Sequence, residues 1–345
     1  MENNKKIVVG FSGGVDSMMT IKILQEQGYQ PIAVFLKMFA GEKIEEVRHL
    51  ADKLAVKLIV KDVSKIFSNC IIGDFLNEYK SNRTPNPCVK CNFEIKFKFL
   101  LEMADELRID KIATGHYAQI KKEGKFFKLL KGKDEKKDQS YFLYRLTQKE
   151  LARIIFPLGG RQKEDVKKEA LKNGWVYEIK ESQDVCFLNK KEKVQDFLKE
   201  NLEENKTGKI EDEEGTVLGQ HQGLVYYTQG QRKGLDLSSG PFYVTGKDSE
   251  RNVLSVSKNK KHSALLNREI LIEDVNWIGR LPVENKNYSF KSRYRAQLTT
   301  GVVIKEENNW RAVLSEPQWA VAKGQSLVVY DGEEVLGGGI IKEVL

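Results

Sequence analysis

The stretch Ser12-Gly-Gly-Val-Asp-Ser17 brings two hydroxyls, a carboxylate and two consecutive glycines together. The apolar residues 7–10 before it predict a short buried strand, and residues 18–25 after it predict a helix. A strand, a glycine turn and a helix N-terminus form an anion site, because glycine lets backbone N–H groups approach oxygens and the helix dipole favours negative charge. The Gly-Lys-Ser/Thr ending of a Walker A loop is missing. The alternative is an ordinary tight turn.

A carboxylate beside phosphate groups requires a cation between them, so Asp16 is a candidate contact for a Mg²⁺ ion that accompanies the bound phosphates. Apart from that ion, the sequence predicts no metal held by the protein alone.

Four cysteines, at positions 70, 88, 91 and 186, are too few and too unevenly placed for a disulfide scaffold. Cys91 follows a loop that Pro85 and Pro87 keep out of regular structure, and it precedes an apolar run that begins at Phe93. A cysteine at a helix N-terminus between lysines should have a lowered pKa, which favours a nucleophile. Two alternatives remain for Cys88-Val-Lys-Cys91: half of a zinc site, or a redox-active dithiol.

Cys186 lies between Val185 and Phe187. These apolar neighbours predict a short strand or strand-like loop, and such a position is typical of a buried structural cysteine.

Strands expected at 7–10, 32–36, 56–60 and 112–115 alternate with helices at 18–25, 45–54 and 67–79. This alternation predicts an α/β fold with a doubly wound, mostly parallel sheet. Ligands of such sheets bind at the carboxyl ends of the strands, where the stretch Gly10–Ser17, Leu36 and Gly115 should meet. Leu36 and Gly115 are candidate contacts for adenine or ribose, or else plain packing residues.

Beyond the α/β domain the character of the chain changes. We expect the α/β domain at 1–204, ending in a linker helix at 190–204, and then a small β-rich domain at 205–266. Residues 267–345 should form a C-terminal β-barrel, with turns at 330–333 and 337–339.

The chain of 345 residues has a net charge of +8. Residues 1–204 carry 38 basic and 31 acidic side chains, so the excess lies in the part that contains the predicted anion site. A polyanion should therefore dock there, although a lysine-rich solvated surface would give the same balance. Neither an apolar run of about 18 residues nor a signal peptide is found, and the sequence predicts a cytoplasmic protein with no membrane partner.

Several motifs taken together resemble one family, the tRNA-specific 2-thiouridylases or MnmA proteins, whose catalytic domain has the PP-loop fold of the adenine nucleotide alpha hydrolases. The motifs are Phe11-Ser-Gly-Gly-Val-Asp-Ser17, Arg83-Thr-Pro-Asn-Pro87, Cys91-Asn, Thr114-Gly-His-Tyr-Ala118, Lys137-Asp-Gln-Ser-Tyr141, Cys186-Phe187, Tyr227-Thr-Gln-Gly-Gln-Arg-Lys-Gly-Leu235, Arg293-Tyr-Arg-Ala-Gln297 and Leu336-Gly-Gly-Gly339. The resemblance covers nearly the whole chain. It implies ATP-dependent replacement of O2 by sulfur in uridine 34, the wobble base of certain tRNAs.

The resemblance also assigns roles to residues. Cys91 would be the nucleophile and Cys186 the carrier of a persulfide, with a Cys91–Cys186 disulfide left after transfer. A cysteine desulfurase or sulfur-relay protein would deliver the sulfur. ATP would contact Gly10, Phe11, Ser12, Gly13, Gly14, Val15, Asp16, Ser17, Leu36 and Gly115. The tRNA anticodon stem-loop would contact Asn86, Pro87, Cys88, Lys137, Asp138, Gln139, Arg293 and Tyr294.

Two departures from the family pattern stand out: Cys88 replaces an aspartate, and the segment between Lys37 and Glu45 is short and lacks the family's acidic, tryptophan-containing insertion. Competing hypotheses are another PP-loop adenylating enzyme, of amidotransferase or synthetase type, and a tRNA-binding protein without catalysis. The sequence does not specify the tRNAs, the sulfur donor, the oligomeric state or the roles of Cys70 and Cys88. It also leaves open whether the sulfur attacks C2 as the Cys186 persulfide or as hydrosulfide that Cys91 releases from it.

Overall fold

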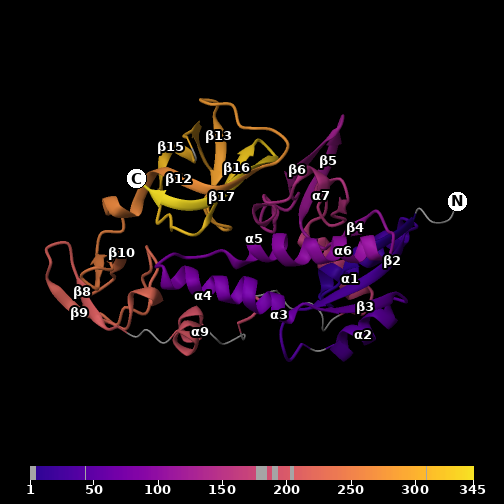
Figure 1. The fold of residues 1–345 in the computed structure, drawn as a ribbon, viewed down its shortest axis with the longest axis horizontal. Coiled ribbons are helices and arrows are strands. Elements are labelled where there is room, and N and C mark those ends of the chain that lie inside the picture. Colours follow the sequence, from indigo (N-terminus) through magenta and orange to yellow (C-terminus); the bar gives the residue numbers. More distant parts are fainter. Residues whose placement is uncertain (1–4, 43, 176–184, 189–192, 203–205, 308) are drawn as a thin grey trace.

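The structure of the chain, a computed structural model, describes residues 5–42, 44–175, 185–188, 193–202, 206–307 and 309–345. Three bodies are visible in Figure 1: a parallel sheet wrapped by helices, a small central sheet on the opposite side, and a barrel above the long helices. None of the helices in the described ranges combines the length and the apolar character needed to cross a lipid bilayer.

The N-terminal body is the predicted α/β fold. Its sheet has the strand order β3-β2-β1-β4-β7, and every pair in it is parallel. The strands are β1 Lys6–Gly10, β2 Gln30–Lys37, β3 Lys57–Asp62, β4 Ile112–Ala113 and β7 Ile154–Ile155. The helices are α1 Val15–Glu26, α2 Ile44–Lys53, α3 Ser64–Phe67, η2 Ser68–Ile72, α4 Gly73–Lys80, α5 Pro87–Cys91, η3 Asn92–Phe97, α6 Lys98–Glu106, η4 Ser140–Phe142, α7 Gln148–Leu151 and α8 Lys163–Lys172.

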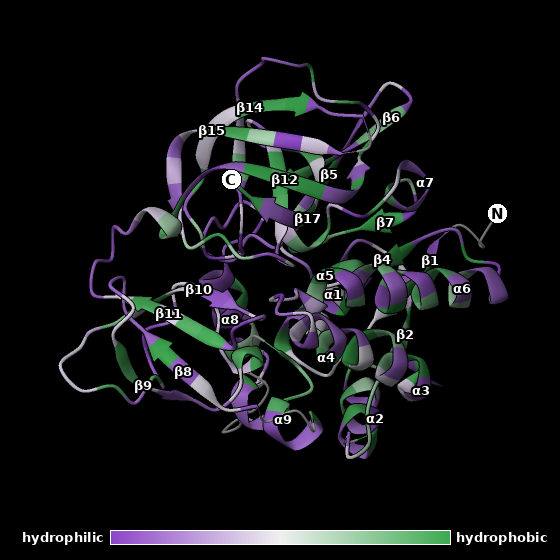
Figure 2. Cartoon of the chain, turned by 60° about the vertical axis from the view of Figure 1, so that its left-hand side comes forward, coloured by the Kyte–Doolittle hydropathy of each residue, from purple (hydrophilic) through white to green (hydrophobic). Residues whose placement is uncertain are grey.

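Alternate residues of β1 enter two different cores, as expected for a sheet covered on both faces. Ile7 and Val9 pack with residues of α1, α2 and α8, whereas Val8 packs with the helices of residues 64–106. Figure 2 shows apolar residues concentrated on the strands of this sheet and of the barrel.

The central sheet has the order β10-β11-β8-β9, in which β11 and β8 are parallel. Its elements are β8 Gly208–Glu211, β9 Val217–His221, η5 Leu224–Tyr226, β10 Tyr243–Asp248 and β11 Val253–Ser257. Phe75 and Tyr79 of α4 and Leu198 of α9 (Val194–Asn201) pack into the core of this sheet. The predicted linker helix at 190–204 is thus α9, and its residues 190–192 and 203–204 lie outside the described ranges.

The C-terminal strands close into the predicted barrel, in the order β12-β15-β14-β13-β16-β17, with β17 pairing back to β12. They are β12 Leu266–Trp277, β13 Tyr288–Lys291, β14 Thr299–Lys305, β15 Trp310–Trp319, β16 Ser326–Asp331 and β17 Glu334–Val344, preceded by η6 Ser263–Leu265. The sequence did not foretell that the hairpin β5 Ala118–Glu123 and β6 Phe126–Lys131 joins this sheet, because β6 pairs with β17.

The predicted turn at 337–339 is wrong, because these glycines lie inside β17. A Cβ atom at Gly337 would come within 2.1 Å of the Asn276 carbonyl oxygen, and one at Gly338 within 2.3 Å of the Leu327 oxygen. The run therefore lets β17 lie closely between β12 and β16.

We expect Gly338→Ala to lower the free energy of unfolding by about 2 kcal/mol, because the added methyl group would overlap backbone that cannot move aside. Urea denaturation followed by tryptophan fluorescence would measure this loss. The control is Gly246→Ala in β10, where a Cβ atom would meet no heavy atom within 4 Å among the described residues. Equal stabilities for the two variants would contradict the prediction.

Candidate active site

The glycine loop between β1 and α1 has the geometry of an anion site. Gly13 has φ +77°, and Gly14 forms the N-cap of α1. The hydroxyl of Ser17 donates to the Gly14 carbonyl at 2.8 Å and accepts from the Ser12 amide at 3.3 Å. Within the described part of the chain no side chain caps this helix, so its first amide groups remain for a ligand.

The segment that follows β4, the neighbour of β1 in the sheet, packs closely against this loop. A Cβ atom at Gly115, after β4, would lie 3.0 Å from the backbone carbon and oxygen of Asp16, so only glycine fits there without a shift. Leu36, at the end of β2, and Phe11, after β1, are both buried. The predicted nucleotide residues thus gather at one edge of the sheet, around a glycine loop with a helix N-terminus that no described side chain caps. Adenine contact by Leu36 stays a prediction.

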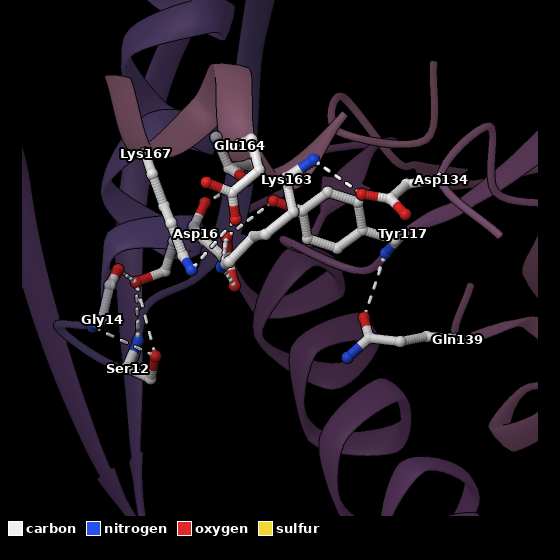
Figure 3. A network of polar contacts seen from close by, with 11 residues as sticks. Ser12, Gly14, Asp16, Tyr117, Asp134, Gln139, Lys163, Glu164 and Lys167 are labelled. Carbon is white, nitrogen blue, oxygen red and sulfur yellow. Dashed lines mark hydrogen bonds and ion pairs between the residues drawn. The ribbon is translucent and has the colours of Figure 1, made fainter. Parts of the chain in front are cut away.

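The Asp16 carboxylate is held by two residues that the sequence analysis did not single out as partners. Lys163 Nζ lies 2.5 and 2.6 Å from its two oxygens, and the Tyr117 hydroxyl donates to it at 2.9 Å. Figure 3 shows both side chains converging on Asp16 from outside the loop. The carboxylate expected beside Mg²⁺ is bound to an ammonium group in this structure.

The prediction that Cys91 begins a helix and has a lowered pKa is wrong. The helix begins at Pro87, which occupies its first turn, and α5, η3 and α6 continue it to Glu106. Proline is accepted in a first turn, where its missing N–H group has no helical partner. Cys91 is therefore one turn inside and 4% exposed, and burial raises the pKa of its thiol to about 12. Lys90 pairs with Asp74 instead.

Cys186 also differs from expectation. It lies in a turn and is exposed, neither on a strand nor buried. Phe187 fixes this turn by edge-on ring contacts with Phe67 and Phe75, with ring centroids 6.1 and 5.3 Å apart. Desolvation by the surrounding protein still raises the pKa of the Cys186 thiol.

Lys96 connects the two thiols. Its positive charge lowers the pKa of Cys91 and of Cys186 against the larger effect of burial, and it helps burial to lower the pKa of His116 to about 3. Negative charge on Cys186, and to a smaller extent on Cys88, would raise the pKa of Cys91. Cys91 and Cys186, far apart in the sequence, therefore lie within electrostatic range of each other, and Lys96 is a common neighbour of both thiols and of His116.

The predicted tRNA contacts occupy three places. Asn86, Pro87 and Cys88 form the start of α5, and the loop before them is tied to the barrel by Gln325, which donates to the carbonyls of Thr84 and Pro85. The remaining five residues lie in the loop after β6 and in the barrel: Lys137, Asp138, Gln139, Arg293 and Tyr294.

These loop and barrel residues differ in how far their side chains are exposed and free to contact a tRNA. Asp138 is buried, and its carboxylate accepts from the Gly132 amide and from the amide and hydroxyl of Ser140. Gln139 accepts from the Tyr117 amide. Both therefore order the loop, whereas Arg293 is exposed; Tyr294 packs on Phe142 with ring centroids 4.5 Å apart. All five stay predicted contacts.

All four cysteines are free, and in the described ranges no three His, Cys, Asp or Glu side chains gather in a metal-binding cluster. Sequence reasoning missed Lys163, Tyr117 as a partner of Asp16, and Phe187 as an anchor. The charged stretch 162–173 predicts a helix that begins near Lys163, but a helix start says nothing about the partner of that lysine.

This edge of the sheet, with its anion loop and two thiols close to one lysine, is that of a nucleotide-binding α/β enzyme of the HUP class. Family models agree: the chain matches the tRNA methyl transferase HUP domain at residues 5–190, the tRNA methyl transferase PRC-barrel domain at 195–258 and the aminomethyltransferase beta-barrel domain at 267–341.

Similar curated proteins identify the family to which the chain belongs. The chain is 39% identical over 360 residues to the tRNA-specific 2-thiouridylase MnmA of Methylobacillus flagellatus, with 99% of each chain covered. It is 40% identical to the protein of that name in Nitrosomonas eutropha, again with 99% of each covered. A solved 4-thiouridine synthetase–RNA complex with bound ATP has a TM-score of 0.37 and 20% identity, over 53% of this chain and 44% of that one, and carries no argument here. The chain belongs to the tRNA-specific 2-thiouridylase MnmA family.

We expect Cys91 to be alkylated by iodoacetamide at pH 8 at least about 100-fold more slowly than the exposed Cys70, because a raised pKa leaves little thiolate and burial blocks access. Each unit of pH increase should speed the reaction about tenfold until the pH nears 12. Peptide mass spectrometry over time gives both rates.

Lys96→Met should slow alkylation of both Cys91 and Cys186, because it removes the charge that favours their thiolates. Lys98→Met is the matched control, since Lys98 lies over the ring of Phe99. Alkylation of Cys91 as fast as that of Cys70 would contradict this view of the site.

Proposed function

We propose that this protein is an ATP-dependent tRNA-uridine 2-sulfurtransferase that converts uridine 34 to 2-thiouridine in the cytoplasm. The observation that carries the proposal is that Cys91 and Cys186, from distant parts of the chain, both lie within range of the charge of Lys96, and that Phe187, next to Cys186, packs against the core that contains Cys91. Membership of the MnmA family supports the same reaction.

The loop residues Gly10–Ser17, with Leu36 and Gly115, would bind ATP, and Asp16 would face its Mg²⁺. Their task is to orient the α-phosphate toward O2 of the uracil. Attack by O2 releases pyrophosphate and converts a poor leaving group into AMP.

Sulfur transfer then uses both thiols. The terminal sulfur of a Cys186 persulfide attacks C2, and AMP leaves with the original oxygen. The Cys91 thiolate attacks the Cys186 sulfur, which breaks the persulfide bond, frees the 2-thiouridine and leaves a Cys91–Cys186 disulfide. An external thiol reductant returns both cysteines to the free state.

The different environments of the two cysteines fit these roles. Cys186 is exposed, so a cysteine desulfurase or sulfur-relay protein can reach it to deliver sulfur. Cys91 is buried and protonated in the free protein, which protects it from oxidation and from competing electrophiles until tRNA binds. Both the target base, which must leave the anticodon stack, and the turn of Cys186 have to approach Cys91.

The test is mass spectrometry of tRNA nucleosides after incubation with ATP, Mg²⁺, a cysteine desulfurase and cysteine. We expect 2-thiouridine at position 34 with the unaltered protein, less than about 1% of it with Cys91→Ser or Cys186→Ser, and near-normal amounts with the control Cys70→Ser. Absence of 2-thiouridine with the unaltered protein would defeat the proposal.

An ATP–pyrophosphate exchange assay separates the steps. Cys91→Ser and Cys186→Ser should retain tRNA-dependent exchange, because neither thiol takes part in adenylation. Full turnover by Cys91→Ser and by Cys186→Ser would indicate an amidotransferase or synthetase type of enzyme. A lack of exchange with the unaltered protein would indicate a tRNA-binding protein without catalysis.

A further inference from the structure

We propose that Lys163 binds the phosphate groups of the nucleotide, and that Asp16 and Tyr117 hold its ammonium group at the loop before the nucleotide arrives. The inference rests on the proposed ATP site. It adds to that site Lys163, which belongs to α8, a helix far along the chain from the glycine loop.

The first argument is the direction of the side chain. Lys163 Nζ reaches both oxygens of Asp16, at 2.5 and 2.6 Å, across from α8 to the first turn of α1. The Lys163 side chain is only 10% exposed, whereas Asp16 is 35% exposed, so the ammonium group lies on the inner side of the pair. The Tyr117 ring also faces it, with Nζ 5.5 Å from the ring centroid.

The second argument is the rigidity of the base from which Lys163 extends. Its backbone N–H donates to Asp134 at 2.9 Å, and Asp134 is itself buried. Val166 and Ala170 of α8 pack in the same core as Met18 and Met19 of α1. The two helices are therefore held together, and only the flexible four-carbon stem of Lys163 is left to move.

The third argument is charge. A buried ammonium group without a partner is costly, so Lys163 needs an anion whether or not nucleotide is bound. Asp16 supplies that anion in the free protein. A phosphate oxygen at the loop would replace it without ever leaving the lysine unpaired, and Asp16 would then be released toward the Mg²⁺ of the nucleotide.

Lys167 of α8 also lies near the loop and pairs with Glu164 at 3.2 Å, but two further basic residues of this region are aimed elsewhere. Arg161 pairs with Glu169 of α8 at 2.8 Å, and Lys168 pairs with Asp165 on the solvent side of the helix. Lys163 instead reaches the glycine loop, as Figure 3 shows. The position fits the β- and γ-phosphates, which leave as pyrophosphate, so the lysine would also stabilise the charge that develops on the leaving group.

The test is equilibrium binding of ATP, pyrophosphate and AMP to the full-length protein by isothermal titration calorimetry, with Mg²⁺ present. We expect Lys163→Met to weaken ATP and pyrophosphate binding at least about 30-fold and AMP binding less than about threefold, because AMP lacks the phosphates that Lys163 contacts. Lys163→Arg should recover part of the loss. The matched control is Lys168→Met, which should bind all three ligands normally.

Circular dichroism and thermal unfolding would establish that each variant is folded. An equal loss of ATP and AMP affinity in Lys163→Met would indicate a purely structural lysine and overturn the inference, as would unchanged ATP affinity. These results differ from failure of the proposed function itself, in which the unaltered protein would bind neither ATP nor pyrophosphate.

Discussion

The close approach of the residue after β4 to the first turn of α1 is the constraint on which the site depends. A parallel sheet brings the carboxyl ends of its strands to one edge, but edges are normally crowded by side chains. Here Gly115 lets its backbone lie against the backbone of Asp16, and Gly10 leaves room for the Leu100 side chain. The nucleotide loop, the Tyr117 hydroxyl and the region of His116 and Lys96 are thereby held in one small volume.

The same packing that builds this edge also suppresses its chemistry in the free protein. Cys91 is surrounded by the core of residues 64–106, which raises the pKa of its thiol, and one lysine only partly opposes that effect. Asp16 and Lys163 cancel each other's charge at the loop. Both the thiol and the ion pair therefore await a substrate that changes their surroundings, as expected when binding energy is used to assemble a reactive site.

Local pattern was enough to predict the parallel sheet, the barrel and the glycine loop, because alternating elements and glycine turns are properties of short segments. Prediction from local pattern failed where contacts between distant parts of the chain determine the local structure. The helix of Cys91 begins earlier than predicted because Pro87 starts a helix instead of preventing one, and Gly337–Gly339 form a strand because two neighbouring strands press on it. The partnership of Asp16 and Lys163 spans 147 residues, and no local signal could reveal it.

The hairpin of β5 and β6 has a further consequence for how the protein is assembled. Leu130 and Leu129 of the N-terminal body pair with Glu334 and Val335 near the end of the chain, so the barrel sheet is completed from both halves of the sequence. A ribosome that has released only the first 200 residues has made a β-ribbon whose outer edge has no neighbour yet. In the order of synthesis, the outer edge of β6 therefore finds its partner only when β17 has been made.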